Sequence, residues 1–291
     1  MKRLFFFFFS LVSLTSCAVW DSPKIARIAL LAPFEGRYRE IGYTAFYPAK
    51  LALGDISHIE LLAVDDGGTI QTAQARARAL ALDDSVKAVL ILGYDSADET
   101  VLRVLGDIPI IIIGEWATQP INDHVFILSH PEIPNMLSYE GRLNITQPIE
   151  SPFQGGDAFG LYTYAGLYSH NEVLPHVQVV TSGAFANPEF TQRLLASDIY
   201  VPQPNHLSTT VYDATRLLAS VISSPHNSRQ AVADFIRNAD FMGEQVGRIR
   251  FGDDGYWLDA PLYTYVYVDN QVDGFSMIAD SARVIEIPPT H

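Results

Sequence analysis

The chain has 291 residues, of which 48% are hydrophobic and 18% charged, and its formal net charge is −14. This composition is typical of a folded protein and argues against disorder, and the length allows two lobes of common domain size. The acidic balance is not offset by any cluster of Lys and Arg. It therefore excludes nucleic-acid binding and disfavours anionic lipid headgroups.

The first 17 residues, MKRLFFFFFSLVSLTSC, indicate an export signal. Lys2 and Arg3 precede an apolar stretch that is too short to span a bilayer. The last four letters, Leu14 to Cys17, resemble a bacterial lipobox, in which cleavage precedes a diacylated cysteine. Cys17 is the only cysteine, so a disulfide within the chain is impossible. We expect a lipoprotein signal peptide over residues 1–17 and lipid attachment at Cys17; the alternative is an ordinary signal peptide with an incidental thiol.

Residues 24–118 alternate between strand and helix patterns. Continuous apolar runs are typical of parallel strands that are covered on both faces, and the alternation predicts an α/β fold with a doubly wound parallel sheet. The helix expected over 43–56 would hold Pro48 in its first turn, where the missing N–H costs little. Ligands of such sheets bind beyond the carboxyl ends of the strands. The four expected strands are KIARIALLAPF, IELLAVDDGG, VKAVLILGYDS and IPIIIIGEWATQP, with ends at 32–38, 65–69, 93–96 and 114–118.

The second half of the chain has a less regular pattern. Residues 126–175 are rich in Pro, Gly, Ser and Asn and predict loops with at most one short helix. Within them PFQGGDAFG, residues 152–160, is interpreted as a turn or as part of a cleft rim. A strand over 177–183 and three helices follow, the first with Asn187 as its N-cap. The chain then reaches an Asp-Gly turn between two β-rich runs, which predicts an antiparallel hairpin.

The order of these motifs resembles the type I periplasmic binding proteins, in particular the branched-chain amino-acid-binding branch associated with ABC transporters. The resemblance covers about residues 24–118 and 177–271, roughly two thirds of the chain after the signal. It rests on IARIALLAPFEGRYREIGYTAFYPAKLAL, on the strand-helix unit that begins at IELLAVDDGG, on VYDATRLLASVI and on FMGEQVGRIRFGDDGYWLDAPLYTYVYVDNQ.

The resemblance implies two lobes with three chain crossings. Lobe one, a parallel α/β unit, would comprise residues 24–125 and 177–239, and lobe two would comprise residues 126–176 and 240–291. Family members usually build the second lobe from several strand-helix units. Here only about 50 residues occupy that interval, so we expect a small, atypical second lobe.

Loops at the strand ends of the first lobe hold the ligand in the resembled family, through hydroxyl groups and N–H groups at helix N-termini. The resemblance places Tyr94 and Ser96 in one such loop and Ala117 and Thr118 in another, while Tyr38 could stack on a ligand. The alternative to ligand contact is that Ser96 caps a helix that starts at Ala97. Two acidic neighbours, Asp95 and Glu115, depart from a neutral loop. They favour a cationic ligand group, or no ligand.

Other motifs indicate neither a metal site nor an enzyme. Asp65 and Asp66 precede two glycines at a strand end, without the alternating ligand spacing of a calcium loop, and predict a structural turn. The histidines are scattered, so a zinc site is not expected. A nucleophile elbow, a phosphate loop and a dinucleotide fingerprint are all missing from the sequence. We expect neither a cofactor nor a metal.

The leading hypothesis is an exported solute-binding protein, lipid-anchored to a membrane on its outer or periplasmic side. It would capture a small polar, amino-acid-like solute for an ABC-type permease. The alternative is an envelope lipoprotein that uses a reduced binding-protein fold as a protein-interaction or regulatory module. A hydrolase that uses Asp65 and Asp66 is the third possibility. Fold analogy is an association and does not by itself establish function.

Overall fold

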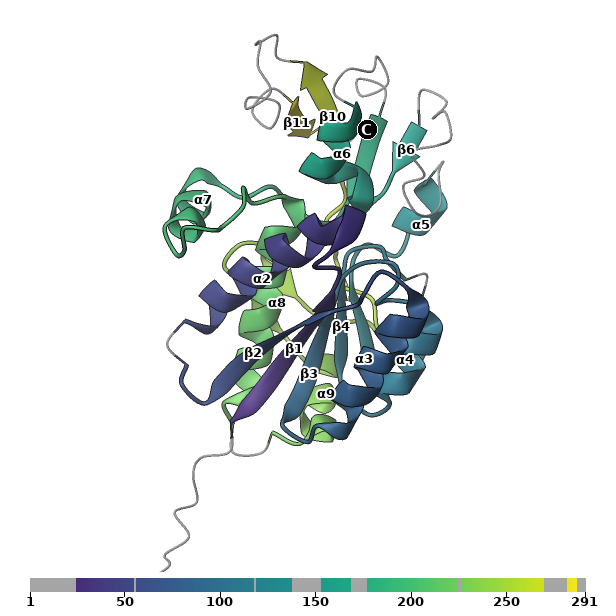
Figure 1. The fold of residues 1–291 in the computed structure, drawn as a ribbon, viewed down its shortest axis with the longest axis vertical. Helices are drawn as coiled ribbons and strands as arrows, with labels where there is room; N and C mark the ends of the chain where they lie inside the picture. Colours follow the sequence, from purple (N-terminus) through teal and green to yellow (C-terminus); the bar gives the residue numbers. More distant parts are fainter. Residues whose placement is uncertain are drawn as a thin grey trace, which may run out of the picture.

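The computed structural model describes residues 25–54, 56–117, 119–137, 153–168, 177–224, 227–269 and 282–286. The expected signal peptide, Cys17 and Thr118 lie outside these residues. Two sheets organise the described chain (Figure 1). We call the part built on the five-stranded sheet the first lobe and the part built on the four-stranded sheet the second lobe.

The sheet of the first lobe is entirely parallel, as the apolar runs predict, with strand order β2-β1-β3-β4-β5. The order reverses between β1 and β3, because β1 connects to β2 on one side while β3 connects to β4 on the other. A crevice forms at such a switch point, beyond the carboxyl ends of the strands. The strands are β1 (Ala26–Ala32), β2 (Ile59–Asp65), β3 (Val86–Ile91), β4 (Ile110–Ile113) and β5 (Val125–Leu128).

Helices cover both faces of this sheet. Helices α3 (Ile70–Leu82) and α4 (Glu99–Leu105) pack together on one face, while α2 (Arg39–Leu53), α8 (His206–Ile222) and α9 (Arg229–Arg237) cover the other (Figure 1). The sheet is therefore doubly wound, and β3, β4 and β5 bury nearly every side chain. In the described part of the chain, no helix is both long enough and apolar enough to cross a bilayer.

The sheet of the second lobe has the order β11-β10-β7-β6. Strand β7 (Val177–Thr181) runs parallel to β6 (Phe153–Gly155) and antiparallel to β10 (Tyr263–Asp269), which also pairs with β11 (Ala282–Glu286). Between the sheets the chain passes three times: from β5 to β6, from β7 to α8, and from the bridge at Trp257 to β10. This agrees with the number of crossings that the resemblance implies.

Two predictions for the part of the chain around the second lobe are wrong. Strand β7, placed with the first lobe by the chain crossings that the resemblance implies, hydrogen-bonds within the second sheet instead. Residues 126–175, expected to be loops with at most one short helix, contain most of β5, helix α5 (Ile133–Met136), strand β6, the 3₁₀ helix η2 (Asp157–Gly160) and helix α6 (Tyr162–Tyr168). Strand β6 has no clear strand pattern in the sequence because it is short and contains a glycine. A Cβ at this glycine, Gly155, would lie only 2.3 Å from the Phe159 ring. Glycine is thus the residue that permits this close packing.

Helix α2 begins earlier than its pattern predicts, directly after the 3₁₀ helix η1 (Gly36–Tyr38). Pro48 therefore lies in the helix interior, not in the first turn. A proline there leaves the carbonyl four residues earlier without its N–H partner. That carbonyl belongs to Thr44, and the Ser208 hydroxyl of α8 donates to it over 3.3 Å. A tertiary contact thus replaces the lost helical hydrogen bond.

Glu40, in the first turn of α2, joins the two lobes. Its carboxylate accepts hydrogen bonds from the backbone N–H groups of Tyr162, over 2.9 Å, and Thr163, over 2.6 Å, at the start of α6. The Asn205 side chain, at the N-cap of α8, donates to the same carboxylate over 3.3 Å. One acidic side chain therefore satisfies otherwise unpaired helix N–H groups across the lobe boundary.

The segment after α9 returns to the edge of the first sheet. Strands β8 (Phe241–Met242) and β9 (Arg248–Ile249) pair antiparallel, and Phe251 forms an antiparallel bridge with Trp257 around the Asp254-Gly255 turn. The predicted hairpin is therefore confirmed. Ile127 of β5 donates its N–H to Gly255 and accepts from Trp257, both over 2.9 Å. The Asn187 cap of helix α7 (Pro188–Leu195) is confirmed as well.

Asp213 fixes the turn between β8 and β9 to helix α8. Its buried carboxylate accepts three backbone N–H hydrogen bonds, from Glu244 over 2.9 Å, Gln245 over 2.7 Å and Val246 over 2.8 Å. These hydrogen bonds give the Tyr-Asp-Ala motif of the sequence a structural role.

We predict that Asp213→Ala lowers the free energy of unfolding by roughly 3 kcal/mol, because three N–H groups lose a buried partner at about 1 kcal/mol each. Urea unfolding measures the change. Ser220→Ala, at an exposed position of the same helix, is the control and should change stability by less than about 0.5 kcal/mol. Equal stability of the two variants would contradict the role of Asp213.

Candidate functional site

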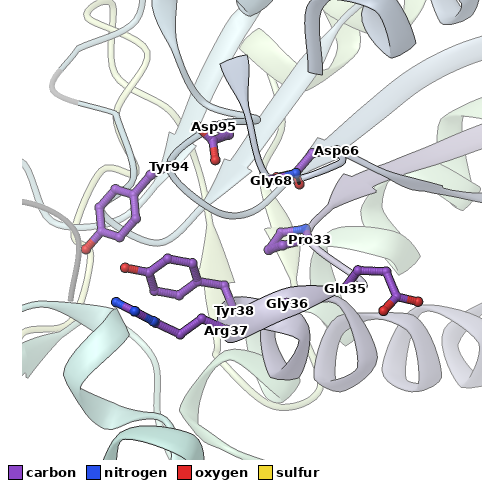
Figure 2. Close-up of a pocket in the computed structure, with 9 residues that line it drawn as sticks. All are labelled: Pro33, Glu35, Gly36, Arg37, Tyr38, Asp66, Gly68, Tyr94 and Asp95. Atoms are coloured by element: carbon purple, nitrogen blue, oxygen red, sulfur yellow. Dashed lines mark hydrogen bonds between the residues drawn. The ribbon is translucent and has the colours of Figure 1, made fainter. Parts of the chain in front are cut away.

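A cavity of about 340 Å³ opens at the carboxyl edge of the first sheet (Figure 2). Its walls come from the loops after β1, β2 and β3, on both sides of the switch point between β1 and β3. This is the place where the sequence predicts a ligand site. The residues that line it are Pro33, Glu35, Gly36, Arg37, Tyr38, Asp66, Gly68, Tyr94 and Asp95.

Close backbone packing shapes the floor of the cavity. Gly93 follows β3 with φ of +96°, a conformation that side chains other than glycine rarely adopt. A Cβ at this position would lie 2.9 Å from the Pro33 ring. Glycine therefore lets the loop after β3 approach the loop after β1, and it directs Tyr94 and Asp95 to the cavity.

Aromatic rings form one side of the cavity. The Tyr38 and Tyr94 rings meet edge to face, with centroids 5.9 Å apart and planes at 70°. Tyr94 meets Trp116 in the same way, with centroids 5.0 Å apart. Such pairs prefer the edge-to-face arrangement because the positive ring edge approaches the negative ring face. The three rings come from the loops after β1, β3 and β4, and they tie these loops together.

Asp66 forms the acidic floor of the cavity and is only 1% exposed. Its carboxylate accepts a hydrogen bond from the Gly68 N–H over 2.8 Å and another from the Ser96 hydroxyl over 2.9 Å. Burial raises the pKa of Asp66, and the nearby Asp95 and Asp65 raise it further, although its two hydrogen bonds act in the opposite direction. Asp65 itself accepts from the Phe34 N–H over 2.7 Å, as expected of a residue that stabilises a turn.

The structure brings together two of the five predicted ligand residues, Tyr38 and Tyr94, at the cavity wall. Ser96 is fully buried behind Asp66, and it does not cap a helix, because α4 starts at Glu99 and its N-cap is Asp98. Ala117 packs, half-buried, against the core and is not part of the lining. Thr118 lies outside the described residues, so its contribution stays a prediction.

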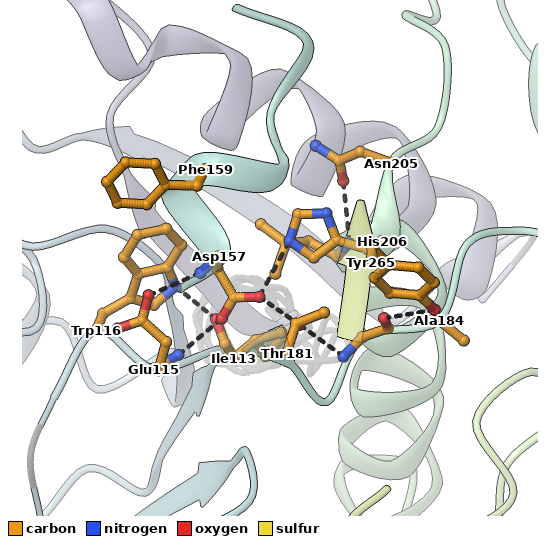
Figure 3. A network of polar contacts seen from close by, with 12 residues as sticks. Ile113, Glu115, Trp116, Asp157, Phe159, Thr181, Ala184, Asn205, His206 and Tyr265 are labelled. Atoms are coloured by element: carbon orange, nitrogen blue, oxygen red, sulfur yellow. Dashed lines mark hydrogen bonds and ion pairs between the residues drawn. The ribbon is translucent and has the colours of Figure 1, made fainter. Parts of the chain in front are cut away.

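A second group of polar residues joins the lobes beside the cavity loops (Figure 3). Glu115, after β4, and Asp157, in η2, bind each other reciprocally: the Glu115 N–H donates to the Asp157 carboxylate over 2.9 Å, and the Asp157 N–H donates to the Glu115 carboxylate over 2.8 Å. The Thr181 hydroxyl, at the end of β7, donates to Asp157 over 2.5 Å. His206, the first residue of α8, places Nε2 at 3.0 Å from the same carboxylate.

The sequence pattern does not reveal this network. Asp157 falls in a segment interpreted as a turn, and His206 was one of several scattered histidines. Glu115, Asp157 and Thr181 share one signal, which is their position at or directly after the carboxyl ends of strands. That signal is readable only when β6 and β7 are assigned to one sheet.

Burial raises the pKa of Glu115 well above its usual range, and the nearby Asp157 carboxylate adds to this effect. The hydrogen bond from the Asp157 N–H opposes it. The neighbouring Asp157 is fully buried, and two carboxyl groups in such a site disfavour a second negative charge. Within the described ranges, no group of three His, Cys, Asp or Glu side chains could hold a metal ion.

No protein-family model matches the chain, and no curated protein matches it. Among solved structures, the branched-chain amino acid transporter substrate-binding protein LivJ from Streptococcus pneumoniae, in complex with isoleucine, matches with a TM-score of 0.65 and 15% identity, over 91% of this chain and 100% of that chain. The leucine-binding protein LivK from Thermotoga maritima matches with a TM-score of 0.63 and 13% identity, over 90% and 98% of the two chains.

A solute-binding protein of an ABC transporter from R. palustris, in complex with benzoate, matches with a TM-score of 0.58 and 14% identity, over 83% of this chain and 93% of that chain. Identities this low show the fold alone. The chain has the two-lobed fold of the type I periplasmic binding proteins, as its motif order predicts.

We predict that Glu115→Gln makes stability less dependent on pH. The folded state raises the pKa of Glu115, so its contribution to stability is complete below the unfolded carboxyl pKa of about 4.3 and is lost as pH rises through the folded pKa. The free energy of unfolding of Glu115→Gln, relative to the unmodified protein, should therefore increase between pH 4 and pH 8. Urea unfolding at several pH values measures it.

The control for this prediction is Glu189→Gln, which neutralises an exposed carboxylate in the first turn of α7. It should follow the pH dependence of the unmodified protein. If Glu115→Gln did the same, the buried carboxyl pair would not be the source of the effect.

Proposed function

We propose that this protein is an exported, lipid-anchored solute-binding protein that captures a small polar solute and delivers it to a membrane permease. The observation that carries the proposal is the cavity of about 340 Å³ at the switch point of the parallel sheet. Ligand pockets of small molecules start at about this volume and commonly occur at such switch points.

The position of the second lobe supports the same function. Glu40 and the Glu115–Asp157 pair connect residues next to the cavity loops to the start of α6 and to η2. A solute in the cavity would therefore lie close to both lobes. The solved structures with this fold include proteins in complex with isoleucine and benzoate, and by analogy we expect a solute of similar size here.

Each predicted ligand residue has a specific role in this proposal. Tyr38 and Tyr94 contact the solute directly, while Ser96 acts through the Asp66 carboxylate that its hydroxyl holds. Ala117 belongs to the loop after β4, next to Trp116, whose ring packs against Tyr94, and Thr118 follows it in the sequence. This loop would approach the solute from the side of the second lobe.

We predict that a small solute raises the melting temperature of the purified full chain in a screen of amino acids, organic acids and amines. A ligand that binds only the folded state adds about 2.7 kcal/mol of stability at a concentration of a hundred times its Kd. Tyr94→Ala should weaken binding about tenfold or more, because it removes one wall of the cavity. Calorimetric titration of the positive compounds measures this loss.

Tyr200→Ala is the matched control, because Tyr200 is 75% exposed and is not part of the cavity lining. It should bind as the unmodified protein does. If no compound shifts the melting temperature of a protein that still unfolds cooperatively, the alternative of a protein-interaction module at the cell envelope replaces this proposal.

The lipid anchor has its own test. We predict that the chain, expressed in a bacterium that processes lipoproteins, sediments with membranes and incorporates labelled palmitate, and that Cys17→Ala abolishes both. The control Ser16→Ala keeps a small residue before the expected cleavage site and should remain membrane-bound. A Cys17→Ala variant that still sediments with membranes would falsify attachment through Cys17.

A further inference from the structure

The charged residues around the cavity are mostly acidic. Three acidic residues line it, Glu35, Asp66 and Asp95, and among the described residues of the lining Arg37 is the only cation. In Figure 2 Asp95 lies above the two tyrosine rings, while Glu35 points away from them. Asp66, in the floor of the cavity, and Asp95 are therefore the acidic residues that decide which charge a solute can carry beside the aromatic wall.

Asp66 is a buried carboxylate whose most important charged neighbours are also acidic. It is 1% exposed, and Asp95, which is 9% exposed, and Asp65 are the nearby charges that act on it. None of the ion pairs found in the described part of the chain includes Asp66. A buried charge is costly unless an opposite charge compensates it. A cation in the cavity would supply this compensation.

The hydroxyl group that the fold resemblance offers to a solute carboxylate is already engaged. The Ser96 hydroxyl donates to Asp66 over 2.9 Å, and the Gly68 N–H, in the turn before α3, donates to Asp66 over 2.8 Å. The protein's own carboxylate thus receives the donors that would otherwise serve an anionic group. A solute carboxylate placed here would meet Asp66 and Asp95 and would be repelled.

The aromatic wall suits a cation as well. Tyr38 and Tyr94 both line the cavity, and their rings meet edge to face rather than stacking face on face. Ring faces carry negative electrostatic potential and attract ammonium groups, most strongly where water is excluded. The carboxylates and the tyrosines therefore favour the same ligand charge from two sides of one cavity.

We propose that the solute is an organic amine whose ammonium group binds between the carboxylates of Asp66 and Asp95 and the rings of Tyr38 and Tyr94. This inference rests on the proposed solute-binding function and specifies its substrate class. It departs from an amino acid held by its carboxylate, because the polarity of this part of the cavity is reversed. A cavity of about 340 Å³ limits the solute to a small amine.

Titration calorimetry of the full chain with putrescine, spermidine, choline, leucine and benzoate tests the proposal. We expect at least one of the three amines to bind and leucine and benzoate to bind more weakly by at least about tenfold. Asp95→Asn should weaken amine binding at least about tenfold, since it removes one charge without a large change in shape. Asp84→Asn, at an exposed position outside the cavity, is the control and should have no effect.

Variants at Tyr94 separate the ring face from the hydroxyl group and keep the test independent of Asp95. Tyr94→Phe retains the ring and should keep amine binding within about threefold, whereas Tyr94→Leu should lose about tenfold. Circular dichroism and cooperative unfolding identify any variant that fails to fold. Amine binding that responds equally to Phe and Leu at this position would contradict the role of the ring face.

The outcomes distinguish this inference from the function on which it rests. Binding of leucine or benzoate in preference to every amine, with loss in Tyr94→Ala, would overturn the amine class and leave solute binding intact. Amine binding that Asp95→Asn and Asp66→Asn leave unchanged would overturn the proposed position of the ammonium group. If none of the five compounds nor any other compound of the wider screen binds, both proposals fail together.

Discussion

The architecture depends on buried and partly buried carboxylates that accept hydrogen bonds from backbone N–H groups of loops and helix starts. Glu40 binds the first turn of α6, Asp157 binds the loop after β4, and Asp213 binds the turn between β8 and β9. Backbone N–H groups at such places have no partner within their own element, and leaving them buried and unpaired costs about 1–3 kcal/mol each. In each case one acidic side chain therefore fixes the position of a segment that has no such hydrogen-bond acceptor within itself.

The same type of contact explains how the cavity is built and why its floor is acidic. Asp65 holds the loop after β1 through the Phe34 N–H, and Asp66 holds the turn before α3 through the Gly68 N–H. Asp65 has a purely structural position, whereas Asp66 also faces the cavity. Adjacent carboxylates of one strand end thus serve two purposes, because successive side chains point in different directions.

The first lobe could be predicted from the sequence almost completely, because long apolar runs and amphipathic helices are local signals. The Asn187 cap was readable for the same reason. Strand β6 was not, since three residues with a glycine carry no periodicity. The hydrogen bond that compensates for Pro48 in the helix interior comes from Ser208, which is far away in the chain. In the candidate site, Tyr38 and Tyr94 could be predicted because both lie in loops that follow predicted strands. The Glu115–Asp157–His206 network could not, because it needs contacts across both lobes.

Fold and ligand chemistry follow separate constraints in this protein. Identities of 13–15% to solved binding proteins are sufficient for the same arrangement of sheets, since many apolar residues can fill the same core. The charge of the cavity, in contrast, depends on single side chains in loops. A hydroxyl group that faces open space can donate to an anionic solute, whereas a hydroxyl group next to a carboxylate donates to that carboxylate. Ser96 occupies a position that the resemblance assigns to solute binding, yet it donates to Asp66. The contacts of such a residue, more than its type, therefore determine which solute the loop can hold.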